Sequence, residues 1–227
     1  MINEDSGVIG EVEKPSVFGM IMNPKEQLEK IRNNPKSLMP VLIVTAVTFI
    51  GILLLYYSFT VPPELFEELS EQELQLALNV GKITLIVAGL IGPIFGITLA
   101  SLIYFLVAKM IRSEVSFKQM FSMFAHLNII GAIGSIIHGL AVLLIPGINQ
   151  EISITSLESI VNAGGILGAV LNSVEIFGIW QIIITAIGLQ IVAKFSKQAA
   201  WTTVIVIVLI GLSFTMISAG INSVTGF

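Results

Sequence analysis

Residues 174–194 read VEIFGIWQIIITAIGLQIVAK, and this stretch is apolar for long enough to cross a bilayer, which takes ~20 residues of helix. Its polar and small residues recur every three or four positions, at Glu175, Gly178, Gln181, Thr185 and Gly188. That spacing places them on one face of a helix. In lipid, small residues let helices approach closely and polar side chains find partners between helices. The stretch therefore predicts the central helix of a multi-helix membrane domain.

The composition of the whole chain agrees with a membrane protein. Of its 227 residues, 55% are hydrophobic and only 11% are charged, whereas soluble domains carry ~25% charged residues. The formal net charge of -4 argues against binding to nucleic acid. The chain contains no cysteine, which excludes disulfides and thiolate metal sites.

Five apolar runs are long enough to span a bilayer as helices. They are residues 38–59, 83–108, 121–145, 174–193 and 201–219. Tyr56, Tyr57 and Trp201 stand near the ends of these runs, where aromatic side chains favour the membrane interface. The sequence therefore predicts an all-α fold, an integral membrane bundle of five helices with short amphipathic helices at the surface.

The basic residues predict how the bundle sits in the membrane, because lysine and arginine gather in cytoplasmic loops. With five spans and the N-terminus inside, ten of the eleven basic residues fall on the cytoplasmic side. Lys82 alone falls outside. We therefore expect the N-terminus to be inside and the C-terminus outside.

The segments before and after the spans complete the predicted organisation. Residues 1–22 begin with an acidic, polar run that is typical of a disordered cytoplasmic tail. Residues 23–37 predict a helix that starts at Asn23-Pro24 and is both basic and amphipathic. It is either a solvated helical linker or a helix on the membrane surface, and the spanning segment that follows within a few residues favours the surface helix. The membrane domain then covers residues 38–219, and residues 220–227 form a short outer tail.

Two of the outer segments are longer than turns. Residues 62–80 are acidic and predict one or two short helices, because Ser70 and Glu73 have capping-box spacing. This acidic segment is either a solvated surface helix or an attractor for a cationic partner. In residues 146–173, Thr155 and Glu158 have the same capping-box spacing, and apolar side chains indicate that the segment rests on the bilayer or on the bundle.

Small residues recur at four-residue intervals in three of the spans. They are Gly92, Gly96 and Ala100 in the second span, Gly131, Ser135 and Gly139 in the third, and Gly211, Thr215 and Ala219 in the fifth. Pro93 lacks a backbone donor and should bend the second span. The spacing fits either close helix packing or a pore, and it favours packing because such stripes are the ordinary means of helix association in lipid.

Few polar side chains lie within the spans. His126 and His138 are twelve residues apart on one helix, ~18 Å, which is too far to share one metal ion. His138 is either a packed histidine that donates to a carbonyl or part of a proton relay. Glu175 either sits among lipid headgroups or takes part in pairing. The sequence shows no phosphate loop, nucleophile motif or metal-ligand set, so we expect no enzymatic activity, cofactor or metal site.

Three stretches of the sequence resemble the bacterial Yip1 family of multi-pass membrane proteins. The first is residues 174–201, with Glu175, Phe177, Trp180 and Gly188; the second is residues 111–126 (IRSEVSFKQMFSMFAH); the third is Asn23-Pro24, Asn34-Pro35 and Pro40. The resemblance covers about Pro24 to Leu212. It implies a five-span all-α fold without catalytic residues, in the bacterial plasma membrane.

The resemblance does not extend to the eukaryotic members of the family. Their Asp-Leu-Tyr-Gly-Pro sequence is replaced here by residues 89–93, GLIGP, which keep only the Gly-Pro. A link to vesicle traffic and small GTPases is therefore not carried over. Some bacterial relatives look like accessory subunits of ABC-type exporters that protect cells from antimicrobial peptides, although a fold alone does not fix a function.

Three functional hypotheses follow from the sequence. The first is a non-enzymatic accessory or assembly protein whose partners are the lipid bilayer and other membrane proteins, among them ABC transporter subunits of an efflux complex. The second is a small transporter or channel with a path near Gln181, Thr185, His138 and Pro93. The third is a membrane-organising scaffold that senses lipid through its basic surface helix.

Overall fold

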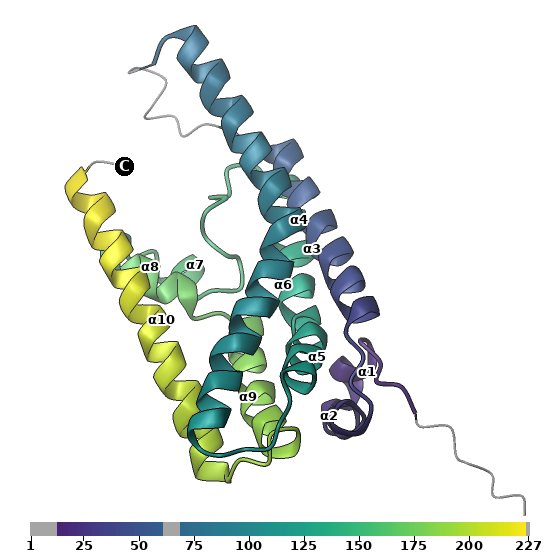
Figure 1. Cartoon of the computed structure of the whole chain (residues 1–227). Helices are drawn as coiled ribbons and strands as arrows, with labels where there is room; N and C mark the ends of the chain where they lie inside the picture. The colour runs from purple at the N-terminus through teal and green to yellow at the C-terminus, as the bar shows by residue number, and fades with distance from the viewer. Residues whose placement is uncertain (1–12, 61–68, 226–227) are drawn as a thin grey trace, which may run out of the picture.

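The computed structural model describes residues 13–60 and 69–225 and consists of helices joined by turns (Figure 1). The helices are α1 (Gly19–Met22), α2 (Pro24–Asn33), α3 (Leu38–Ser58), α4 (Glu71–Met110), α5 (Phe117–Leu127), α6 (Ile129–Leu144), α7 (Glu158–Val161), α8 (Gly165–Ser173), α9 (Ile176–Ile191) and α10 (Lys197–Thr225). The predicted all-α membrane bundle is confirmed. Residues 1–12, 61–68 and 226–227, which include most of the predicted tail and residues 62–68 of the acidic segment, lie outside the described residues.

Four apolar stretches in the described residues are long enough to cross a membrane as helices. They are α3, α4, α5 together with α6, and α10. The fourth predicted span is present as α9, but α9 has only 16 residues and rises ~24 Å, which is less than the ~30 Å hydrocarbon core. It begins late because Val174 accepts a backbone hydrogen bond from Leu157 and Ile176 donates one to Thr155. Leu157 and Thr155 belong to the predicted outer segment, residues 146–173, which we call the outer loop. The bundle thus has four long apolar helices and one shorter one.

The acidic segment and the second predicted span form a single helix. α4 has 40 residues, so it extends ~60 Å, about twice the thickness of the hydrocarbon core. Ser70 and Glu73 form the predicted capping box, but the expected separate helices are absent from residues 70–80. The helix continues because Gly81, the one flexible position before the span, is packed against the ring of Phe59. The first turns of α4 therefore project beyond the rest of the bundle.

The third predicted span is nearly continuous but breaks into α5 and α6 at Asn128. The side-chain amide of Asn128 donates to the carbonyl of Phe124 at 2.8 Å, and its backbone N–H bonds to the same carbonyl. The α5 helix begins with a second capping box, formed by Ser116 and Gln119. The break exposes Asn128 to the space between α4, α9 and α10.

The tightest packing in the bundle joins α3 to α6. A Cβ atom added at Gly139 would lie 2.6 Å from the backbone oxygen of Gly51, and one added at Gly51 would lie 2.7 Å from the backbone of Ser135. Glycine is required at both positions because the two backbones approach this closely. The small residues of the third span therefore do pack helices, as predicted. Figure 1 shows α10 leaning away from this group, with α8 beside it.

The α2 helix begins at Pro24, as predicted, but its apolar side does not face lipid. Leu28 and Ile31 are completely buried against the inner ends of α5 and α9. The backbone carbonyls of Arg32 and Lys36 accept hydrogen bonds from side chains of α5. The apolar side of α2 therefore packs on the bundle, which supplies the apolar surface that the helix needs, and the predicted position of α2 at the membrane surface stays a prediction.

The ends of the bundle allow a direct test of the predicted orientation. Figure 1 places α1 and α2 at one end of the molecule and the start of α4 and the end of α10 at the other. Because the chain has no cysteine, single cysteines can report the two sides. We expect Gln72→Cys and Asn222→Cys to react with a membrane-impermeant maleimide on intact cells. Lys118→Cys should react only after permeabilisation, and the reverse pattern would contradict the N-inside orientation.

Candidate functional site: a groove within the membrane

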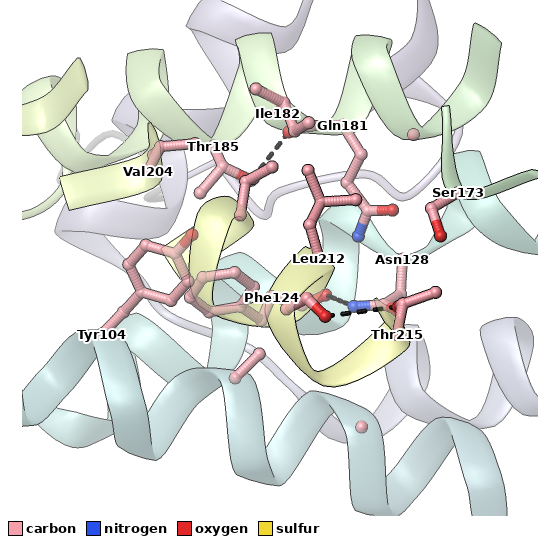
Figure 2. A pocket seen from close by; sticks show the side chains of 15 residues that line it. Tyr104, Phe124, Asn128, Ser173, Gln181, Ile182, Thr185, Val204, Leu212 and Thr215 are labelled. Atoms are coloured by element: carbon pink, nitrogen blue, oxygen red, sulfur yellow. Dashed lines mark hydrogen bonds between the residues drawn. The ribbon is translucent and has the colours of Figure 1, made fainter. Parts of the chain in front are cut away.

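A groove of about 480 Å³ lies between α4, α9 and α10, at the level where α5 meets α6 (Figure 2). It is lined by fifteen residues: Gly96, Ala100, Tyr104, Phe124, Asn128, Ser173, Gly178, Gln181, Ile182, Thr185, Val204, Val208, Gly211, Leu212 and Thr215. All of these residues except Ser173, which is in α8, belong to the four long apolar stretches or to α9. The groove is therefore a hollow inside the membrane region, with a mainly apolar lining that carries several polar side chains.

The predicted stripe on α9 is divided among three environments. Gly178, Gln181 and Thr185 line the groove. Glu175 lies at the outer end of α9, where its carboxylate accepts hydrogen bonds from two hydroxyls of the outer loop. Gly188 faces α5, since a Cβ there would lie 2.7 Å from the sulfur of Met123. The stripe is thus divided: Gly178, Gln181 and Thr185 face the groove, while Glu175 and Gly188 contact other parts of the protein.

Most polar groups of the groove bond back to their own helices. The hydroxyl of Thr185 donates to the carbonyl of Gln181 at 2.7 Å, and the hydroxyl of Thr215 donates to the carbonyl of Gly211 at 3.3 Å. Such local bonds are usual for threonine in helices. They satisfy each hydroxyl proton and leave the oxygen free to accept a bond from another molecule.

The small residues of α4 and α10 border the groove without touching another helix. Among residues 13–60 and 69–225, a Cβ added at Gly96 or Gly211 would meet no atom within 4 Å, and the same holds for Gly92, which does not line the groove. Gly92 directly precedes Pro93, where a side chain would crowd the proline ring and glycine relieves the crowding. Within this chain these glycines are therefore not helix-packing contacts, unlike Gly139.

The remaining candidates lie away from the groove. Nε2 of His138 lies 3.1 Å from the carbonyl oxygen of Gln150, the contact expected of a packed histidine. The side chain of Gln150 donates in turn to the carbonyl of Ser58, so this chain of bonds ties the outer loop to the end of α3. Trp180 packs against the core, and Pro93 lies within α4, which continues through it as a helix.

The second histidine, His126, is completely buried in α5, with Nδ1 2.7 Å from the carbonyl oxygen of Ser122. It is thus far from His138 along the third span. In the part of the chain that the structure describes, no three acidic, histidine or cysteine side chains are grouped as a metal ion would require. The groove accordingly offers hydrogen bonds and apolar contact rather than ligands for a cation.

Sequence reasoning missed the role of Glu158 in the outer loop. Its carboxylate is 3% exposed and accepts hydrogen bonds from the backbone N–H groups of Ala163 and Gly164, at 3.2 and 2.8 Å. The predicted capping box with Thr155 is wrong, because the carboxylate turns the other way, toward the start of α8. There it meets the positive end of the helix dipole, and it holds the corner that sets α8 against α10.

We expect Glu158→Gln to destabilise this corner by about 1–3 kcal/mol, because one buried N–H group loses its acceptor. Hydrogen exchange of the Ala163 and Gly164 amides, measured by mass spectrometry, should become faster. Glu151→Gln is the matched control, since Glu151 lies in the same loop and is exposed. Equal exchange in both variants would contradict the assigned role of Glu158.

Comparison with known proteins places this bundle in a family. Residues 18–218 match the Yip1 domain. The chain belongs to the Yip1 family. It is also 33% identical, over 229 residues, to a Bacillus subtilis (strain 168) protein named "Membrane protein YknW", with 99% of this chain and 98% of that protein covered. No solved structure matches the chain. The predicted family is thus confirmed, and the match includes every residue that lines the groove.

Two residues of this Yip1 bundle that line the groove had no signal in the small-residue stripes. Tyr104 lies in residues 102–108, LIYFLVA, where its hydroxyl is the one polar side-chain group. Asn128 is a lone amide within the third span, and an intramembrane polar residue is a reasonable candidate on that ground alone. What the sequence did not reveal is that these two residues face Gln181 across one groove.

Proposed function

We propose that this chain is a non-enzymatic accessory protein of the bacterial plasma membrane that binds and helps to assemble another membrane complex. The complex that we propose is an ABC-type exporter that protects the cell from antimicrobial peptides or toxins. Two observations support the proposal: the chain belongs to the Yip1 family, and its membrane region contains the groove described above. The proposal assigns the chain a role in binding, because the groove carries hydrogen-bonding groups but no paired acid and base.

The observation that carries the proposal is the pair of small-residue surfaces that this chain leaves unused. Gly96 of α4 and Gly211 of α10 both line the groove, and in the described part of the chain neither has a neighbour within 4 Å of an added Cβ. Most of the surface of α10 is likewise exposed. Helices in lipid associate through such small residues because they permit close packing. A membrane protein that keeps two such surfaces open is suited to receive helices of a partner.

Affinity purification tests the proposal. The full chain, tagged at its C-terminus, is purified from native membranes in mild detergent and its companions are identified by mass spectrometry. We expect the permease and ATPase subunits of one exporter, in amounts comparable with the bait. Recovery of this chain without any exporter subunit would contradict the proposal.

The structure offers less support for the other two hypotheses. The transport path was expected near four residues, of which Gln181 and Thr185 line the groove while His138 and Pro93 do not. For the scaffold, the apolar side of α2 is already buried. In addition, Lys30 of α2 pairs with Glu13 and Glu26 at 2.7 and 2.5 Å, which reduces the basic charge available to lipid headgroups.

A further inference from the structure

The side chain of Tyr104 is largely buried, and its hydroxyl opens onto the groove without a partner among the described residues. Tyr104 is only 7% exposed, and its ring packs against Phe124 with the ring centroids 4.9 Å apart. The hydroxyl makes no hydrogen bond to any residue that the structure describes, and it lines the groove beside Thr185 and Val204 (Figure 2). A buried tyrosine hydroxyl usually has a hydrogen-bond partner. The missing partner therefore points to a molecule that enters the groove.

A second free group lies on α9. The side-chain amide of Gln181 makes no hydrogen bond among residues 13–60 and 69–225, and Figure 2 shows it extending toward Asn128 and Thr215. An amide that faces hydrocarbon without a partner is unfavourable because lipid tails offer neither donors nor acceptors. Tyr104 and Gln181 therefore both require a hydrogen-bond partner from the molecule that fills the groove.

The depth of these two groups decides which occupant fits. Tyr104 precedes Lys109 by five residues of helix, ~8 Å, and Gln181 precedes Lys194 by thirteen residues, ~20 Å. Both therefore lie inside the ~30 Å hydrocarbon core if the lysines mark its inner surface. The ester and headgroup atoms of a phospholipid stay at the interface, and its tails cannot hydrogen-bond. A lipid would leave both groups unsatisfied.

A membrane-spanning helix satisfies both groups. Polar side chains on such a helix hydrogen-bond to neighbouring helices within the bilayer. Tyr104 lies near Thr185, which follows Gln181 by one helical turn, so the two free groups lie at different depths. Hydrogen-bonding residues four or seven positions apart on the incoming helix would face both groups. The open space at Gly96 and Gly211 allows the backbone of that helix to approach.

We infer that the groove receives one membrane-spanning helix of the partner complex, and that the Tyr104 hydroxyl and the Gln181 amide bond to polar side chains of that helix. The inference rests on the proposed function, which supplies the partner. The groove selects a helix with small residues on its contact face and with serine, threonine, asparagine or glutamine at the two levels. A purely apolar helix is rejected because it leaves both groups unpaired.

Photo-crosslinking from within the groove tests the inference. Benzoylphenylalanine replaces Leu212, which lines the groove, or Leu209, which is 56% exposed and does not line it. The full chain is irradiated in native membranes and the adducts are mapped by mass spectrometry. We expect the Leu212 probe, but not the Leu209 probe, to join a membrane-spanning peptide of an exporter subunit. Adducts only with lipid, adducts with a second copy of this chain, or no adduct would each overturn the inference.

A double variant tests the two hydrogen-bonding groups themselves. Tyr104→Phe keeps the ring against Phe124, and Gln181→Met keeps the length of the side chain without its amide. Together they should lower the adduct yield at Leu212 by about tenfold, while the melting temperature in detergent stays unchanged. An undiminished yield would overturn the assigned role of both groups, and a lowered melting temperature would assign them to folding instead.

The outcomes separate this inference from the proposed function. If exporter subunits copurify while the Leu212 probe labels only lipid, the inference is overturned and the proposed function stands. If the probe labels a spanning helix of a protein that is not an exporter, the groove is supported as a helix site and the exporter assignment is overturned.

Discussion

Replacing Gly139 by alanine is expected to lower the free energy of unfolding by about 1–3 kcal/mol, the usual cost of overpacking a well-filled core. The new methyl group would meet the backbone oxygen of Gly51 at 2.6 Å and Cβ of Leu54 at 2.9 Å. Neither atom can rotate away, because one belongs to the backbone and the other is fixed to it. The α3 and α6 helices would have to separate along their whole contact, so Gly139→Val should cost still more.

Gly211→Ala is the matched control for this prediction. A Cβ at Gly211 meets no atom within 4 Å, so the substitution should leave the protein equally stable or raise its stability by about 0.5–1 kcal/mol through helix propensity. Unfolding is followed by circular dichroism in detergent with increasing denaturant. If the two variants unfold alike, the close approach of α3 and α6 is not what holds the bundle together.

Gly96→Leu is expected to reduce recovery of the partner by about tenfold or more while leaving the bundle folded. Leucine at this position projects into the groove and occupies the space that the incoming helix needs, and overpacking an interface costs about 1–3 kcal/mol. The fold itself should tolerate the change, because a Cβ added at Gly96 meets no atom of the described residues within 4 Å and the rest of the side chain extends into the groove. The measurement is the amount of exporter subunit recovered per amount of bait.

Thr98→Leu serves as the control on the same helix. Thr98 lies two residues from Gly96, is exposed and does not line the groove, and its hydroxyl bonds only to the carbonyl of Ile94 in the described structure. Recovery of the partner should therefore remain close to that of the unmodified chain. Equal losses in both variants would show that the partner contacts α4 outside the groove, and no loss in either would remove Gly96 from the interface.

The sequence by itself determined the class of fold. Apolar runs of spanning length can only be helices in lipid, because each backbone N–H and C=O must be satisfied within its own segment. That requirement is local, so the apolar runs predicted where the long apolar helices lie, although not that the acidic segment joins α4 or that the third run divides into α5 and α6. The sequence also identified one polar face on α9, since helical periodicity alone places Gly178, Gln181 and Thr185 together.

Tertiary structure decided what each face does. Gly139 and Gly96 stand in similar stripes, yet one lies against a backbone and the other borders an open groove. The sequence cannot separate them, because the difference depends on which helix lies opposite, and that is set by residues far away in the chain. The same reason applies to His138, which bonds to Gln150, and to Glu158, which turns toward α8. Local periodicity fixes which residues share a face, but only the packing of the helices fixes what that face meets.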